Sequence, residues 1–175
     1  MNHWMRPFLV VCTLAPASWA DPPVVRQASW DDVKTSLADH ELAVVDLWSL
    51  SCAPCLEEFP GLVKLEAQYG DQIHCVGVSV DYDGRRRRPP ETYAARVQAF
   101  VEEMNAVNID HVLCTTPSDD VLADVGAASI PTVLIYRRGE LIEKFVDAGA
   151  TAGFTYEANV APAVAKRLSP PAPRK

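Results

Sequence analysis

The chain has 175 residues, of which 49% are hydrophobic and 22% are charged, and its formal net charge is −7 at pH 7. This length and composition are typical of one globular domain with an adequate core. The excess of acidic residues argues against general nucleic-acid binding, because a negative protein surface repels a phosphate backbone. We expect a monomeric domain with no nucleic-acid partner.

Residues 1–20 have the pattern of a secretory signal peptide. Arg6 supplies a positive charge, residues 8–14 are apolar, and the segment ends in Ser18-Trp19-Ala20, with small residues where a signal peptidase cleaves. The apolar stretch is shorter than the ~20 residues that cross a membrane. We therefore predict cleavage before Asp21 and export to the periplasm, with an uncleaved membrane anchor as the alternative.

Residues 21–168 alternate between strand and helix patterns, and a Pro-rich tail, residues 169–175, is predicted to be disordered. Ser29 and Ser118 are placed to cap helices, and Gly70 to end one. The predicted strands are 24–27, 42–48, 74–80, 111–114, 132–136 and 141–146, and the predicted helices are 30–38, 56–69, 91–107, 119–125 and 156–168. This order, with a hairpin formed by the last two strands, predicts an α/β sandwich.

The sequence Cys52-Ala53-Pro54-Cys55 stands where a buried strand gives way to a helix. Free N–H groups at a helix N-terminus stabilise a thiolate, which is the reactive form of cysteine. Cys52, at the exposed helix end, is the expected nucleophile, and Cys55 is expected to resolve the mixed disulfide. A static disulfide or half of a zinc site would have the same spacing.

Three segments resemble the thioredoxin fold and, within it, the exported TlpA/ResA-type thiol-disulfide oxidoreductases. They are Trp48-Ser49-Leu50-Ser51-Cys52-Ala53-Pro54-Cys55, Leu56-Glu57-Glu58-Phe59-Pro60 and Ser129-Ile130-Pro131-Thr132. The resemblance implies a mixed central sheet flanked by helices, with a cis peptide before Pro131. Residues 84–116 fall where this group inserts a helix and a strand. Two positions depart from the pattern: Ser51 replaces an aromatic residue, and Asp46 replaces Asn but matches the buried Asp of thioredoxin.

Two acids are candidate catalytic residues beside the cysteines. Asp46 lies inside an apolar strand, so burial should raise its pKa, and the resemblance to thioredoxin implies that it accepts a proton from Cys55. Glu58 follows Cys55 by one helical turn, and the resemblance to ResA-like proteins implies that it tunes the site. Alternatively, Asp46 is a hydrogen-bonded core acid and Glu58 is a solvated residue on the helix surface.

The substrate is expected to contact residues around the motif. Ala53 and Pro54 lie between the cysteines, and Trp48 is expected to pack beside them and shape the groove. A cis Pro131 would bring the Ile130 backbone next to Cys52, where an extended substrate could pair with it. A trans turn proline is the alternative.

The resemblance also implies partners: a protein substrate that carries a disulfide or a thiol pair, and a membrane electron donor. Apocytochrome c, as in cytochrome c biogenesis, another oxidoreductase and a copper protein are all open as substrates. Ala53 and Pro54 carry no cation that would stabilise the reduced form, which favours a reductase over an oxidase. No cofactor is expected.

A copper- or zinc-binding module is the alternative function, with Cys52, Cys55 and either His111 or Cys114 as ligands. The spacing argues against copper, since copper-handling relatives of this fold have CxxxC motifs. His111, like His74, is otherwise expected to be an ordinary strand-edge histidine.

Cys75 opens one predicted strand and Cys114 closes the next, so in parallel neighbours their sulfurs would lie at opposite ends. Because a disulfide needs Cα atoms within roughly 7 Å, we expect two buried free thiols, with a structural disulfide as the alternative.

The loop Arg85-Arg86-Arg87-Arg88 follows a strand end, as the CxxC motif does. It is either simply solvated or shares the active face and steers an acidic partner.

Overall fold

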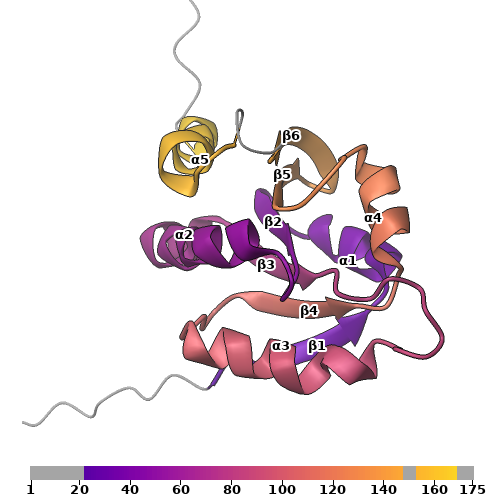
Figure 1. The fold of residues 1–175 in the computed structure, drawn as a ribbon. Coiled ribbons are helices and arrows are strands. Elements are labelled where there is room, and N and C mark those ends of the chain that lie inside the picture. The colour runs from indigo at the N-terminus through magenta and orange to yellow at the C-terminus, as the bar shows by residue number, and fades with distance from the viewer. Residues whose placement is uncertain (1–21, 148–152, 169–175) are drawn as a thin grey trace, which may run out of the picture.

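The computed structural model describes residues 22–147 and 153–168, in which one six-stranded sheet lies between two layers of helices (Figure 1). The strands are β1 (Val25–Ala28), β2 (Ala43–Trp48), β3 (His74–Ser79), β4 (Asp110–Cys114), β5 (Thr132–Arg137) and β6 (Glu140–Val146). Their order in the sheet is β1-β4-β3-β2-β5-β6. The first four pair in parallel, whereas the β2–β5 and β5–β6 pairs are antiparallel. The predicted fold class, a mixed sheet flanked by helices, is confirmed.

The helices form two layers because the central strands are apolar on both faces. One face is covered by α2 (Ala53–Tyr69), α3 (Glu91–Glu103) and α5 (Ala161–Leu168), together with the short turns η1 (Gly70–Gln72) and η2 (Tyr156–Val160). The other face is covered by α1 (Trp30–Leu37) and α4 (Ser118–Val125) (Figure 1). We call the two resulting apolar clusters the α2 core and the α1 core.

Strand β2 contributes to both cores by simple alternation. Val44 and Trp48 lie in the α2 core, and Ala43 and Leu47 lie in the α1 core. Asp46 stands between Val44 and Trp48 in this alternation and therefore faces the α2 core. All six residues of the strand are buried, so the Asp46 carboxyl must find its partners inside the protein.

Helix α3 and strand β4 lie in the chain between β3 and Pro131, at the place where the family resemblance puts an insertion. Because β1 pairs along its outer side, β4 is an inner strand, and His111 on it is 1% exposed. The expectation of a strand-edge position for His111 is therefore wrong. The His111 Nε2 atom lies 2.7 Å from the Ala106 carbonyl oxygen, which accepts its hydrogen in the neutral ring.

The predicted elements differ from the observed ones mainly at helix ends. Ser29 caps α1, and Gly70, with a φ of 36°, follows α2, both as predicted. The predicted cap at Ser118 is wrong, because Ser118 is already the first residue of α4 and no side chain caps that helix. Helix α3 ends at Glu103, earlier than predicted, because the chain turns at Asn105, whose φ is 48°.

The predicted signal peptide, residues 1–20, and the Pro-rich tail, residues 169–175, lie outside the described residues. Within the described part of the chain, no helix combines the length and the apolar character that crossing a membrane requires.

Candidate active site

The CxxC motif opens helix α2 at the end of strand β2. Cys52 and Cys55 form a disulfide, with Cα atoms 5.2 Å apart. Cys52 is the N-cap of α2, and its sulfur accepts a hydrogen bond from the Cys55 backbone N–H at 3.2 Å. Cys55 is 1% exposed, whereas Cys52 is partly exposed and Ala53 and Pro54 are exposed. An incoming substrate can therefore reach the Cys52 sulfur but not the Cys55 sulfur.

The loop between β2 and the motif is held by Asp81, which lies two residues after the end of β3. The Asp81 carboxylate accepts hydrogen bonds from the Ser49 hydroxyl at 2.9 Å, the Ser79 hydroxyl at 2.7 Å and the Leu50 backbone N–H at 3.1 Å. The Ser49 and Ser51 hydroxyls also lie 3.0 Å apart. Sequence reasoning missed Asp81, although an acid placed directly after a buried strand was a usable signal.

The Ile130–Pro131 peptide bond is cis, as the family resemblance implies. Thr132 pairs with Leu47 in the antiparallel β2–β5 ladder. Ile130 therefore lies beyond the C-terminal end of β2, at the same end of the sheet as the CxxC motif. The turn is fixed by the Thr132 hydroxyl, which donates to the Ser129 carbonyl at 2.6 Å, and by the Asp147 N–H, which donates to the Pro131 carbonyl at 3.0 Å.

Asp46 lies under helix α2 and is 1% exposed. The Tyr156 hydroxyl donates a hydrogen bond to Asp46 Oδ2 at 2.9 Å, while Oδ1 has no hydrogen-bond partner among the described residues. Burial raises the pKa of Asp46 to about 7; the Tyr156 hydrogen bond opposes this rise, and the nearby Glu58 charge adds to it. Asp46 is therefore a buried acid whose proton can exchange near neutral pH.

Tyr156 is the residue that sequence reasoning missed most completely. It lies 110 positions after Asp46, is 4% exposed, and donates its backbone N–H to Glu58 Oε2 at 3.0 Å. Its ring fits under α2 only because residue 61 is glycine: a Cβ at Gly61 would lie 2.3 Å from the Tyr156 Cβ. The one available signal was that a buried carboxyl in a strand requires a hydrogen-bond donor.

Glu58 is partly exposed and lies at the edge of a hollow of about 540 Å³ between α2 and η2. Its hydrogen bond to the Tyr156 backbone means that it is not simply a solvated helix-surface acid. The structure thus brings Asp46, Glu58 and Tyr156 together as one electrostatically connected group.

Trp48 does not lie where a substrate-contacting residue would. Its side chain is 1% exposed and packs against Phe59 and Phe100, with ring centroids 5.1 and 4.7 Å away. Because Trp48 faces the α2 core, it supports the motif from below, in contrast to the expectation that it shapes the groove surface.

The other two cysteines of the described residues, Cys75 and Cys114, are free and buried in different cores. Cys75 lies in the α2 core, where burial raises the pKa of its thiol to about 12, and Cys114 lies in the α1 core, where burial also raises the pKa. Cys114 therefore faces away from Cys55 across the sheet. Among residues 22–147 and 153–168, no three His, Cys, Asp or Glu side chains are grouped so as to hold a metal ion.

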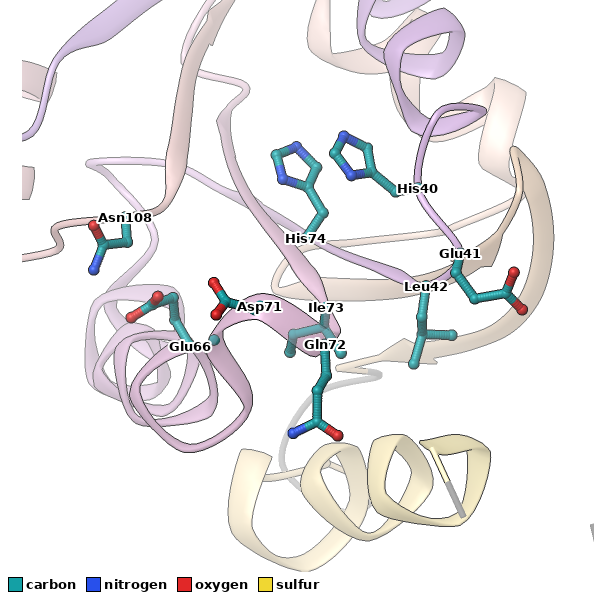
Figure 2. A pocket seen from close by; sticks show the side chains of 10 residues that line it. His40, Glu41, Leu42, Glu66, Asp71, Gln72, Ile73, His74 and Asn108 are labelled. Atoms are coloured by element: carbon teal, nitrogen blue, oxygen red, sulfur yellow. The ribbon is translucent and has the colours of Figure 1, made fainter. Parts of the chain in front are cut away.

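A separate polar hollow of about 470 Å³ lies at the opposite end of the sheet, where β2 and β3 begin (Figure 2). The rings of His40 and His74 stack there, with centroids 3.7 Å apart, and the side chains of Glu66 and Asp71 lie in the same view. Burial lowers the pKa of His74. None of the described residues that line this hollow is a cysteine, and the hollow lies at the end of β2 opposite to the motif.

No family model matches the chain. Several solved structures match the chain. A secreted Mycobacterium tuberculosis disulfide oxidoreductase homologous to Escherichia coli DsbE matches with a TM-score of 0.53 and 19% identity over 72% of this chain and 81% of that chain. The thioredoxin domain of a thiol-disulfide oxidoreductase from Bacteroides vulgatus matches with a TM-score of 0.53 and 20% identity over 77% and 84%. A thioredoxin-like protein in the oxidised form matches with a TM-score of 0.56 and 16% identity over 77% and 82%.

These matches establish the fold. The chain has a thioredoxin-like fold, and its Cys52–Cys55 disulfide begins the helix that follows the central strand β2.

The buried position of Asp46 predicts a pH-dependent stability. The unfolded pKa is near 3.8 and the folded pKa is about 7, so the cost of burying the ionised form begins above pH 3.8, grows up to pH 7 and is constant above it. We expect Asp46→Asn to raise the free energy of unfolding by a few kcal/mol more at pH 8 than at pH 4. Paired urea denaturation curves measure this difference. The exposed Asp39→Asn is the control, and an equal effect of Asp46→Asn at both pH values would contradict the prediction.

The Tyr156 hydrogen bond predicts a shift in the titration of Asp46. Removing the donor with Tyr156→Phe removes an interaction that lowers the pKa, so Asp46 should titrate at a higher pH than in the parent protein. Carboxyl ¹³C NMR across the pH range measures the midpoint. Tyr136→Phe removes a buried hydroxyl from the α1 core and should leave the midpoint unchanged. A downward shift for Tyr156→Phe would show that the hydroxyl does not stabilise the carboxylate.

Proposed function

We propose that this protein is an exported thiol-disulfide oxidoreductase of the TlpA/ResA type, which reduces disulfides in protein substrates through the Cys52/Cys55 pair. The observation that carries the proposal is the contrast between the two sulfurs. The Cys52 sulfur is accessible at a helix N-terminus, and the Cys55 sulfur is buried in the α2 core, which Asp46 also faces. Reductive thiol-disulfide exchange needs one attacking and one resolving thiol with this arrangement.

In the first step, the Cys52 thiolate attacks one sulfur of the substrate disulfide. A Cys52–substrate disulfide forms, the substrate S–S bond breaks, and the second substrate sulfur leaves as a thiolate that takes a proton. The Cys55 N–H that points at the Cys52 sulfur and the positive end of the α2 dipole stabilise the attacking thiolate.

In the second step, Cys55 attacks the Cys52 sulfur and releases the remaining substrate thiol. The Cys55 thiol must first lose its proton, and Asp46 is the proposed acceptor because its pKa of about 7 lies close to neutral pH. Two electrons pass from the protein to the substrate, and the Cys52–Cys55 disulfide forms. Tyr156 holds one carboxyl oxygen of Asp46, and the other has no hydrogen-bond partner among the described residues.

The proposed location and redox direction of this reaction rest on the sequence. The pattern of residues 1–20 supports export, and the absence of a charged residue between the cysteines supports the reducing direction. A membrane electron donor would return the Cys52–Cys55 disulfide to the dithiol. The Ile130 backbone, next to the cis Pro131, is the proposed pairing edge for an extended substrate, and exposed Ala53 and Pro54 are proposed to contact it.

Covalent trapping tests the assigned roles of the two cysteines. Cys55→Ser should accumulate mixed disulfides with substrates in intact cells, because Cys52 attacks but nothing resolves the product. The matched variant Cys52→Ser should accumulate few, since the Cys55 sulfur is buried. Non-reducing electrophoresis followed by mass spectrometry identifies the adducts. More adducts with Cys52→Ser than with Cys55→Ser would reverse the roles.

The reducing direction is tested by the midpoint potential. With no cation between the cysteines, the midpoint potential of the Cys52/Cys55 couple should lie nearer to that of thioredoxin, about −270 mV, than to that of the strong oxidant DsbA, about −120 mV. Equilibration with glutathione buffers and thiol alkylation measure it. A midpoint potential near that of DsbA would contradict the proposed reducing direction but not the proposed thiol-disulfide exchange.

A further inference from the structure

A groove of about 430 Å³ starts at the candidate active site and extends under the arginine-rich loop. Ser51, which directly precedes Cys52, and Ile130, which directly precedes the cis proline, both line it. A volume of this size lies within the usual range for a bound ligand. A substrate segment that reaches Cys52 can therefore enter this groove.

The lining combines an apolar part with two guanidinium groups. Val80, Tyr93 and Leu122 contribute apolar surface, while Arg88 comes from the loop and Arg96 from helix α3. The groove can thus bury a hydrophobic part of a ligand and bind an anionic group close by.

The loop that presents Arg88 has a defined structure. Asp83 accepts hydrogen bonds from the Arg85 backbone N–H at 3.2 Å and from Arg88 Nη2 at 3.0 Å, and the Ser118 N–H donates to the Tyr82 carbonyl at 2.8 Å. These bonds tie the loop to the start of α4. Arg88 is consequently held at the groove before a ligand arrives, which lowers the entropic cost of binding.

The acids of the groove are already occupied by partners within the protein. Asp81 accepts three hydrogen bonds from the motif loop and from β3. Asp83 forms ion pairs with Arg85 and with Arg88, and the Arg88 side chain stays 49% exposed while it is paired. Arg96, like Arg86 and Arg87, is exposed and has no ion pair within the part of the chain that is described. Residues 81–96 hold five arginines and three acids in a chain whose net charge is −7. Residues 81–96 thus carry a net charge of +2 beside the disulfide, while the groove lining itself holds two arginines and two acids.

From this placement we propose that the groove selects protein substrates that carry an acidic side chain close to the target cysteine, with Arg88 and Arg96 as the specificity-determining residues. This inference rests on the proposed function, because it assigns the substrate class of that same disulfide. The acidic side chain would bind the two guanidinium groups while the substrate sulfur lies at Cys52. The net positive charge of residues 81–96 would also accelerate encounter with acidic proteins, which the rest of this acidic surface repels.

The test compares two synthetic peptides that each contain one internal disulfide, flanked in one by glutamates and in the other by glutamines. The protein is first reduced and desalted, and peptide reduction is followed by acid quench and chromatography. Each rate is divided by the rate of the same peptide with 2-mercaptoethanol, which corrects for intrinsic reactivity. We expect the glutamate peptide to be reduced about three- to tenfold faster at low ionic strength, and this advantage to disappear in concentrated salt.

Substitution then locates the effect. R88Q/R96Q should abolish the preference for the glutamate peptide, whereas R137Q/R138Q, which removes the same charge at the far end of β5, should retain it. R137Q/R138Q should reduce the neutral bis(2-hydroxyethyl) disulfide at the parental rate, and circular dichroism with thiol titration should show that the fold and the two thiols of R88Q/R96Q are intact. Equal rates for the two peptides, or a preference that survives R88Q/R96Q, would overturn the inference and leave the proposed function standing. If the reduced parent protein reduces neither peptide nor the small disulfide, the proposed function fails with it.

Discussion

The register of the central strand β2 is the constraint on which the rest of the site depends. Because the strand is buried on both faces, its alternation assigns every side chain to one of the two cores. A shift of one residue would move Asp46 and Trp48 into the α1 core, away from the disulfide. The same register pairs Leu47 with Thr132 and so brings the cis proline to the end of the sheet at which the CxxC motif begins.

Helix α2 serves the site through its N-terminus and through its underside. Its first turn presents the Cys52 sulfur to the Cys55 N–H, and its underside packs on Tyr156, which binds Asp46. Gly61 allows the Tyr156 ring to pass beneath the helix and reach the carboxyl from the C-terminal part of the chain. The last turn η2 and helix α5 are thereby part of the electrostatic environment of the site, although they lie about a hundred residues after the motif.

The features that the sequence predicted are those encoded locally. The position of Cys52 at a helix end, the burial of Asp46 in an apolar strand and the general α/β alternation all depend on neighbours within a few residues. The features that it missed depend on pairing between distant segments. The Tyr156–Asp46 hydrogen bond spans 110 positions, and the inner position of His111 follows from the sheet order, which periodicity alone does not give. Trp48 shows the intermediate case, since its place beside the motif was predictable and its complete burial was not.

The arrangement also bears on whether the Cys52–Cys55 disulfide is reactive or merely structural. A structural bridge gains nothing from a buried acid in the strand that leads to it, and burying Asp46 with one oxygen lacking a hydrogen-bond partner among the described residues costs stability above pH 3.8. Nor does a structural bridge require one sulfur to be accessible beside a groove. The proposed exchange with substrates accounts for both features, because in it Asp46 takes the resolving proton and the groove receives the polypeptide. Under that proposal, the stability cost at Asp46 is a requirement of the second step, in which a buried thiol must lose its proton where water does not reach.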